Sequence, residues 1–140
     1  MARYPRAVRR LTLLAVLALG LAACGGSGGS KAAVEITLGR SGGTMVPTSV
    51  TIAPGGRLTG VDHLILKSNA ISSAEDAKLS RLVRNDFPSL ESKQCPRTFP
   101  DESSSFITAL GKTVTVRGTC EPGFTKLWNA LEKALGLPQA

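Results

Sequence analysis

One short segment has the residue spacing of a serine-hydrolase nucleophile. Gly39-Arg40-Ser41-Gly42-Gly43 matches the pattern G-x-S-x-G, in which the serine stands on a sharp turn between a strand and a helix. The residues after it, Thr44-Met45-Val46-Pro47, cannot begin that helix. The single histidine, His63, has its neighbour Asp62 as the sole acid between Ser41 and itself, and adjacent residues cannot orient as a catalytic triad demands. We interpret the match as a glycine-rich turn and expect no enzyme.

The remaining candidates for chemistry are cysteines. Cys95 and Cys120 lack C-x-x-C spacing, and a lone His63 cannot assemble a histidine-based zinc site. The sequence also offers no glycine-rich phosphate loop with a following lysine. We therefore expect neither a metal ion nor a cofactor.

Cys24 stands where a thiol would be acylated. Arginines lie between Arg3 and Arg10, and the apolar run Leu11–Ala23 follows them, at about the length of a signal-peptide core and below the about 20 residues of a spanning helix. The run ends in Leu21-Ala22-Ala23-Cys24, which resembles a lipobox whose cysteine accepts diacylglycerol before cleavage. The alternatives are ordinary secretory cleavage at the same small residues and an uncleaved anchor.

The segment after Cys24 favours the lipoprotein interpretation. Gly25–Ser30 contains only glycine and serine and is expected to behave as a flexible tether. Acyl chains such as palmitate contribute about 0.8 kcal/mol for each buried methylene, so no spanning helix is needed. We predict a cleaved signal peptide over 1–23, the lipidated cysteine and tether over 24–31, and one domain over 32–140. The domain would lie on the outer face of the cytoplasmic membrane, or on the outer membrane of a didermal cell.

The net charge of +7 does not indicate a nucleic-acid partner. It comes from 17 basic and 10 acidic residues, but four of the arginines lie in the predicted leader, which leaves 13 basic residues in the mature chain. The remaining charges form no basic stripe, and aromatic residues are few. We exclude nucleic acid and expect the bilayer and an envelope protein as partners.

Alternating apolar residues predict several short strands. Val34, Ile36 and Leu38 alternate with Glu35 and Thr37, the period of a half-buried strand. Gly111-Lys112 separates two further alternating runs, and a two-residue loop with glycine first suits a type II′ hairpin turn. The strands are expected at 32–38, 49–53, 64–66, 106–110 and 113–117.

Two segments have the period of amphipathic helices. Ser72-Ser73-Ala74-Glu75 reads as a capping box, and a helix should run from it to about Asn85, with Pro88 preventing continuation. The second helix should begin near Pro122 and end at Gly136. Its apolar positions fall on one stripe, in which Trp128 is expected to be a core residue: Phe124, Leu127, Trp128, Leu131, Ala134 and Leu135.

These elements predict an α+β domain. A small antiparallel sheet of about four strands should carry the two amphipathic helices on one face. Cys95 and Cys120 should form a disulfide in the oxidising compartment outside the membrane. The bond would close a loop of 25 residues and hold the irregular segment 92–105 against the last helix.

The order of elements and one motif resemble the emfourin-like, or protealysin inhibitor-like, family of small proteins that inhibit thermolysin-like metalloproteases. The similarity lies in Ile36–Gly43, where a first strand runs into an Arg-Ser-Gly-Gly turn, and in the second strand Val50-Thr51-Ile52. It continues through the first helix, the hairpin Thr113–Val116 and the closing helix. Thr44-Met45 replaces the expected aromatic residue, and the Cys95–Cys120 pair, the signal peptide and the tether are additional.

The resemblance implies a non-catalytic interaction module that inhibits an extracytoplasmic protease. The partner-binding turn would consist of Arg40, Ser41, Gly42, Gly43, Thr44 and Met45, where glycines permit close approach of a partner's backbone. The alternative interpretation of this segment is a structural turn. The alternative function is a lipoprotein that binds a small ligand or an envelope component in an apolar cleft between sheet and helices.

Overall fold

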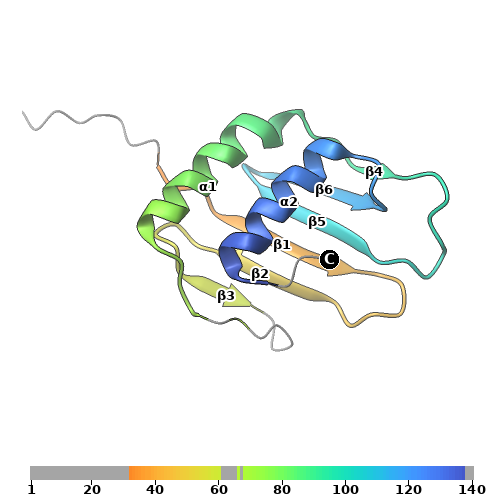
Figure 1. Ribbon diagram of the computed structural model, residues 1–140, viewed down its shortest axis with the longest axis horizontal. Helices are drawn as coiled ribbons and strands as arrows, with labels where there is room; N and C mark the ends of the chain where they lie inside the picture. Colours follow the sequence, from red (N-terminus) through yellow and green to blue (C-terminus); the bar gives the residue numbers. More distant parts are fainter. Residues whose placement is uncertain (1–31, 61–65, 67, 138–140) are drawn as a thin grey trace, which may run out of the picture. The chain divides into compact units, whose positions relative to one another are not determined.

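The described residues form a mixed sheet with helices packed against it. The computed structural model describes residues 32–60, 66 and 68–137, and within these ranges six strands lie in the order β3-β2-β1-β5-β6-β4 (Figure 1). The elements are β1 (Ile36–Ser41), β2 (Thr48–Ile52), β3 (Leu58–Gly60), α1 (Ser73–Asp86), the 3₁₀ turn η1 (Phe87–Ser89), β4 (Lys93–Gln94), β5 (Ser104–Ala109), β6 (Lys112–Arg117) and α2 (Pro122–Leu135). The α+β class is as predicted.

The alternation along the central strands gives the sheet one apolar face. Leu38 lies opposite Val50 on β2 and opposite Ile107 on β5, and all three side chains are buried. Because side chains of a strand alternate between faces, the intervening residues point the other way. The apolar face is the one that the helices cover.

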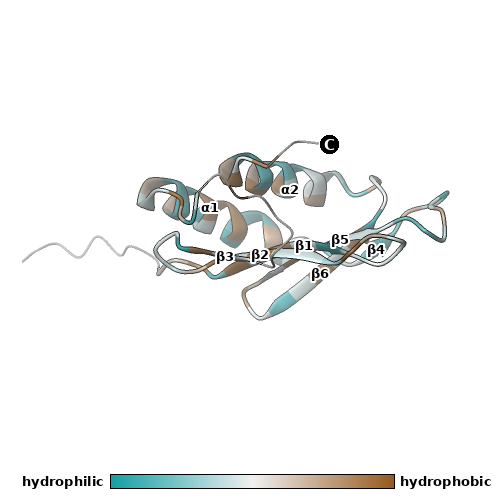
Figure 2. Ribbon diagram, turned by 90° about the horizontal axis from the view of Figure 1, so that it is seen from below, coloured by the Kyte–Doolittle hydropathy of each residue, from teal (hydrophilic) through white to brown (hydrophobic). Residues whose placement is uncertain are grey.

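Threonines form a row across the opposite face. Thr59, Thr51, Thr37, Thr108 and Thr113 occupy matching register positions on five neighbouring strands. Within the row, the hydroxyls of Thr37 and Thr51 are hydrogen-bonded at 2.8 Å, as are those of Thr108 and Thr113. Figure 2 shows both α1 and α2 on the other side of the sheet, and no described element covers the threonine row.

Both predicted helices are present in the described chain. Ser72 caps α1, accepting a hydrogen bond from the Glu75 backbone N–H at 3.2 Å. The Glu75 carboxylate pairs with Lys78 at 3.4 Å. Helix α2 begins at Pro122 and ends at Leu135, and the following Gly136, with a left-handed φ of 65°, forms its C-cap.

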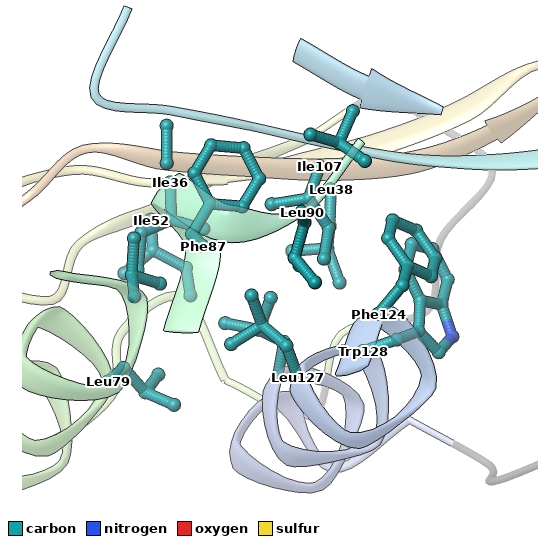
Figure 3. Packing of buried hydrophobic residues seen from close by; sticks show 14 of the residues in the cluster. Ile36, Leu38, Ile52, Leu79, Phe87, Leu90, Ile107, Phe124, Leu127 and Trp128 are labelled. Atoms are coloured by element: carbon teal, nitrogen blue, oxygen red, sulfur yellow. The ribbon is translucent and has the colours of Figure 1, made fainter. Parts of the chain in front are cut away.

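The core lies between the apolar sheet face and one side of each helix. Leu127 and Leu131 of α2 are fully buried, and Phe87 of η1 fills the space beside Ile36 (Figure 3). The buried and half-buried members of this cluster all lie between Val34 and Leu137, and residues 31–140 form one compact unit. The chain from residue 32 onward therefore contains the whole described core.

The sheet departs from the prediction in strand number and direction. Two short strands were not expected, β3 and β4, and β4 runs parallel to β6, so the sheet is mixed with six strands instead of antiparallel with about four. β3 at Leu58–Gly60 follows β2 in the chain. Of the strand predicted at 64–66, Leu66 is not in a strand, and residues 64 and 65 lie outside the described residues. The Leu58 N–H also donates a hydrogen bond to the Asn69 carbonyl at 2.8 Å.

The β5–β6 hairpin is shifted by one residue from the predicted turn. Ala109 pairs with Lys112, so the two turn residues are Leu110 and Gly111 rather than Gly111 and Lys112. Both have positive φ, 52° and 73°, as a type I′ turn requires. Strand β5 also begins at Ser104, two residues earlier than expected.

The disulfide joins Cys95 and Cys120 as predicted. It connects the end of β4 to the segment that enters α2, and the Cys95 N–H also donates to the Arg117 carbonyl at 2.9 Å. The start of the β4–β5 loop is thereby fixed to the end of β6.

Loss of this crosslink should be measurable as lost stability. The Cys95→Ala/Cys120→Ala variant should have a free energy of unfolding lower by about 3–3.5 kcal/mol on the chain-entropy estimate, because the bond spans 25 residues. Urea denaturation of residues 32–140 measures the difference between this variant and the disulfide-bonded wild type, and the reduced wild type, which should lose a similar amount, is the matched control. A loss below about 1 kcal/mol would contradict the proposed constraint.

Candidate partner-binding site

The hydrolase-like motif lies in a hairpin. Ser41 is the last residue of β1, and the chain then turns through Gly42 and Gly43 and enters β2 at Thr48. A strand therefore follows the turn, where a nucleophile elbow requires a helix. Asp62 and His63 lie outside the described residues.

The structure gives no basis for a metal centre or a membrane-spanning helix in its described part. Residues 32–60, 66 and 68–137 contain no cluster of three or more His, Cys, Asp or Glu side chains that could hold a metal ion. In the same ranges, no helix combines the length and apolar character that crossing a bilayer requires. Cys24, the predicted lipidation site, lies outside the described residues.

The predicted partner-binding turn divides into two parts with different surroundings. Arg40 and Ser41 belong to β1 and are half-buried, whereas residues 42–47 are exposed at the end of the sheet. Arg40 lies on the same side of β1 as Leu38, facing α2. The exposed part of the turn thus comprises Gly42, Gly43, Thr44 and Met45, followed by Val46 and Pro47.

The β1–β2 turn contacts the β4–β5 loop. A Cβ atom added at Gly43 would overlap the main-chain carbonyl of Asp101 and lie 3.2 Å from the carbonyl carbon of Glu102. Gly43 also has a φ of 61°, which side chains disfavour. The close backbone approach that its glycine permits is therefore to Asp101 of the same chain. Figure 1 shows both loops extending beyond the same end of the sheet.

The β4–β5 loop is held by contacts of its own. Thr98 Oγ1 donates to the carbonyl of Cys95 at 3.2 Å, and Phe99 N–H donates to Glu102 Oε2 at 3.3 Å. The Glu102 N–H donates back to the Phe99 carbonyl at 3.0 Å. These reciprocal bonds and the disulfide stabilise a loop that otherwise has little regular structure.

Large hydrophobic side chains are exposed on these two loops. Phe99 is 71% exposed, Val46 60% and Met45 37%. We call Met45, Val46 and Phe99, with the loops 42–47 and 97–102 that carry them, the sheet-end surface. Leu110, the other large exposed hydrophobic residue of the described chain, lies at the opposite end, since β5 pairs Ala109 with Ile36 at the start of β1.

A cleft adjoins this surface between the sheet and α2. It has a volume of about 250 Å³. Met45 belongs to both the cleft and the sheet-end surface. The cleft is lined by Leu38, Gly39, Arg40, Met45, Thr48, Val50, Trp128, Glu132 and Leu137.

Three side chains give the cleft its polar character. The Arg40 guanidinium donates to Glu132 Oε1 at 3.2 Å, and its Cζ lies 5.4 Å from the centre of the Trp128 ring. The Glu132 side chain is only 6% exposed and that of Arg40 34%. Trp128 also stacks on Phe124, with ring centroids 5.9 Å apart. Arg40 therefore joins β1 to α2 through an ion pair and a cation–π contact.

Trp128 is a core residue, as predicted, but its polar atom is unsatisfied. The residue is 8% exposed, and its indole Nε1 is buried without a hydrogen-bond partner among the described atoms. In Figure 3 the nitrogen lies on the ring edge that points away from the other labelled core residues. Buried donors without partners are rare and costly in folded proteins.

Known proteins provide no guide to this site. No protein-family model, curated protein or solved structure matches the chain. The function must therefore be argued from the residues themselves.

Several features of the site were not foreseen from the sequence. Phe99 and Val46 lie outside every predicted element. In a loop, the sequence has no periodicity from which the exposure of a hydrophobic side chain could be predicted. The cleft was expected only in general terms, as an apolar space between sheet and helices. Trp128 and Glu132 are four residues apart on α2, a spacing that places them on one helix face, but nothing local indicates Arg40 as their partner.

The Arg40–Glu132 pair yields a stability prediction. Arg40→Met leaves a buried carboxylate unpaired, a change that costs about 3–5 kcal/mol for fully buried pairs. Because Arg40 is 34% exposed, we expect about 2 kcal/mol in urea unfolding after discounting for solvent screening. The control, Arg40→Met/Glu132→Met, should recover most of that loss since no charge stays buried. A double variant no more stable than the single one would contradict this account.

Proposed function

We propose that the protein is a lipoprotein held outside the cytoplasmic membrane. Residues 1–23 act as its signal peptide, Cys24 carries the lipid, and residues 24–31 form the tether of the domain 32–140. The support is the order of the sequence features: basic residues, an apolar run, small residues before cysteine, and a Gly/Ser segment. One acyl chain binds a membrane only reversibly, and a second chain on the same cysteine makes the anchoring stable.

The domain serves as a non-catalytic interaction module. The observation that carries this proposal is the exposure of Met45, Val46 and Phe99 on two loops whose backbones meet at Gly43 and Asp101. Exposed hydrophobic clusters mark surfaces that bind other proteins. Aromatic anchors on preorganised loops lose little conformational entropy on binding.

The partner we propose is a thermolysin-like metalloprotease, which the domain inhibits. The support is the resemblance of the Arg40–Gly43 segment and the order of elements to the emfourin-like family. An exposed turn supported by a second loop also suits a protein that must enter a protease without large rearrangement. The disulfide should slow local opening of this supporting loop.

A second candidate function is favoured by the cleft beside Trp128. In this alternative the domain binds a small ligand or an envelope component instead of a protease. The apolar walls, from Leu38 and Val50 of the sheet, are the supporting observation. Met45 belongs to both sites, whereas Val46 and Phe99 do not line the cleft, so substitution of Val46 and Phe99 separates the two functions.

The membrane anchor can be tested at the side chain of Cys24. Wild-type protein should fractionate with membranes, and mass spectrometry should find diacylglycerol on Cys24. Cys24→Ala should abolish lipidation and the processing that depends on it. An unmodified Cys24 in the wild type, with the protein in the soluble fraction, would contradict the anchor.

Inhibition can be tested with the isolated domain. Residues 32–140 should inhibit cleavage of a peptide substrate by thermolysin stoichiometrically. Val46→Ser/Phe99→Ser should raise the inhibition constant by at least about tenfold, because buried interface anchors are each worth more than about 1 kcal/mol.

Leu110→Ser is the matched control, since it removes an exposed hydrophobic side chain at the other end of the sheet. It should inhibit as well as the wild type. Gly43 variants are unsuitable for this test because the added side chain would displace the loop at Asp101. No inhibition by wild-type domain at micromolar concentration would remove the inhibitor proposal.

A further inference from the structure

We propose that the β5–β6 turn docks on the lipid bilayer, with the Leu110 side chain inserted at the boundary between headgroups and acyl chains. This contact would hold the sheet-end surface away from the membrane, on the side from which a protein partner arrives. The inference rests on the proposed lipid anchor at Cys24 and adds an orientation of the domain to it.

Leu110 combines two features that are unfavourable in a domain surrounded only by water. Its side chain is 45% exposed, and its φ of 52° lies in the left-handed region that L residues disfavour. Asn, Asp and Gly are the residues typical of this position in a type I′ turn. A leucine here gains little burial within the domain, so its apolar side chain points to a contact outside it.

The described chain begins next to this turn. Ile36 at the start of β1 pairs with Ala109, the residue before Leu110, and Ala33 and Leu110 line one surface depression of about 460 Å³. Figure 1 shows the start of β1 and the β5–β6 turn at the same end of the sheet, opposite the loops 42–47 and 97–102. We call residues 32–35 and the turn residues Leu110 and Gly111 the tether end.

Hydrogen bonds to α1 fix the position of the chain at the tether end. The Val34 N–H donates to Ser80 Oγ at 2.9 Å, and both residues are buried. The Arg84 guanidinium donates to the carbonyl of Ala32. The predicted tether therefore joins the domain at a defined point beside Leu110.

The length of the predicted tether keeps this point close to the membrane. Residues 24–31 are eight in number and span at most about 29 Å when fully extended. A Gly/Ser-rich chain of this length has an average end-to-end distance of roughly 14–17 Å. A strand of six residues such as β1 already spans about 17–20 Å, so the sheet-end surface lies farther from the tether than this average reach.

The charges at the tether end are compatible with an anionic bilayer. Arg84 and Lys112 donate hydrogen bonds to backbone carbonyls, which leave both positive charges in place. Glu35 is exposed there, and Asp86 at the end of α1 is paired with Lys126 at 3.0 Å. Basic side chains close to a membrane surface are attracted by anionic lipids, and salt screens this attraction but not the insertion of Leu110.

One leucine is sufficient for docking because the anchor is already in the membrane. Tethering makes the second contact intramolecular and gives it a high effective concentration. Residues 32–140 without the tether should therefore not bind vesicles of phosphatidylcholine and phosphatidylglycerol in a sedimentation assay. The same domain anchored through Cys24 should dock on them.

Docking can be measured on the chain from residue 24 onward. Cys24 is the single cysteine outside the disulfide, so a maleimide phospholipid couples to it specifically. In ¹⁵N-labelled protein on nanodiscs of phosphatidylcholine and phosphatidylglycerol, lipids that carry chelated gadolinium in their headgroups enhance relaxation of nearby amides. The enhancement should be strongest at Leu110 and Gly111 and weakest at Gly43 and Phe99.

Leu110→Asn separates docking from folding. Asparagine tolerates the positive φ, so the urea midpoint should be unchanged or higher. The ratio of docked to undocked domain should nevertheless fall about tenfold, because the inserted apolar side chain is lost. Val46→Asn is the matched control, since it removes an exposed hydrophobic side chain at the opposite end of the sheet, and it should keep the wild-type pattern.

The outcomes separate this inference from the proposed anchor. Equal enhancement at both ends of the sheet, or an unchanged pattern in Leu110→Asn, would overturn the docking while leaving the anchor intact. Leu110 signals that shift with protein concentration in the absence of lipid would also overturn it, because a second copy would then cover the turn. Lipidation in the cell is measured separately by mass spectrometry, and an unmodified Cys24 there would overturn the anchor even if the coupled domain docks.

Discussion

The packing of α2 on the sheet is the constraint on which the rest of this structure depends. Leu127 and Leu131 are fully buried against the sheet, so the rotation of the helix about its axis is fixed. Trp128 and Glu132 then lie beside the buried stripe, over the end of β1, where Arg40 meets both. Met45 from the β1–β2 turn and Trp128 from α2 both line the cleft that is left between the hairpin and the helix.

A second constraint acts between the two loops at the end of the sheet. The disulfide fixes the start of the β4–β5 loop, and the backbone contact between Gly43 and Asp101 fixes the β1–β2 turn beside it. Hydrophobic side chains on loops would normally collapse onto the nearest apolar surface. Here the supporting backbone keeps Phe99 exposed, and a binding surface that is ordered in advance loses less entropy when a partner arrives.

Local signals in the sequence were sufficient for the helices and for most of the hairpins. Ser72 and Pro122 start α1 and α2 as predicted, because caps and proline act on neighbouring backbone groups. The short strands could not be predicted in this way. Lys93–Gln94 becomes β4 through parallel pairing with β6, next to the disulfide at Cys95, and two residues are too few to show an alternation.

The site was harder to predict than the fold because its contacts are distant in sequence. Arg40 was expected in an exposed turn, yet its partner Glu132 lies 92 residues away. The glycines were expected to admit a partner's backbone, whereas Gly43 admits that of Asp101. The disulfide was predictable, since two cysteines in an oxidising compartment leave one pairing.

The central claim, that the sheet-end surface meets the partner, is tested most directly by hydrogen–deuterium exchange of residues 32–140 with and without thermolysin. The account predicts that the complex slows exchange of backbone amides in 42–46 and 97–102, while exchange along the threonine row is unchanged. Slower exchange confined to the threonine row or to the outer sides of α1 and α2 would contradict it.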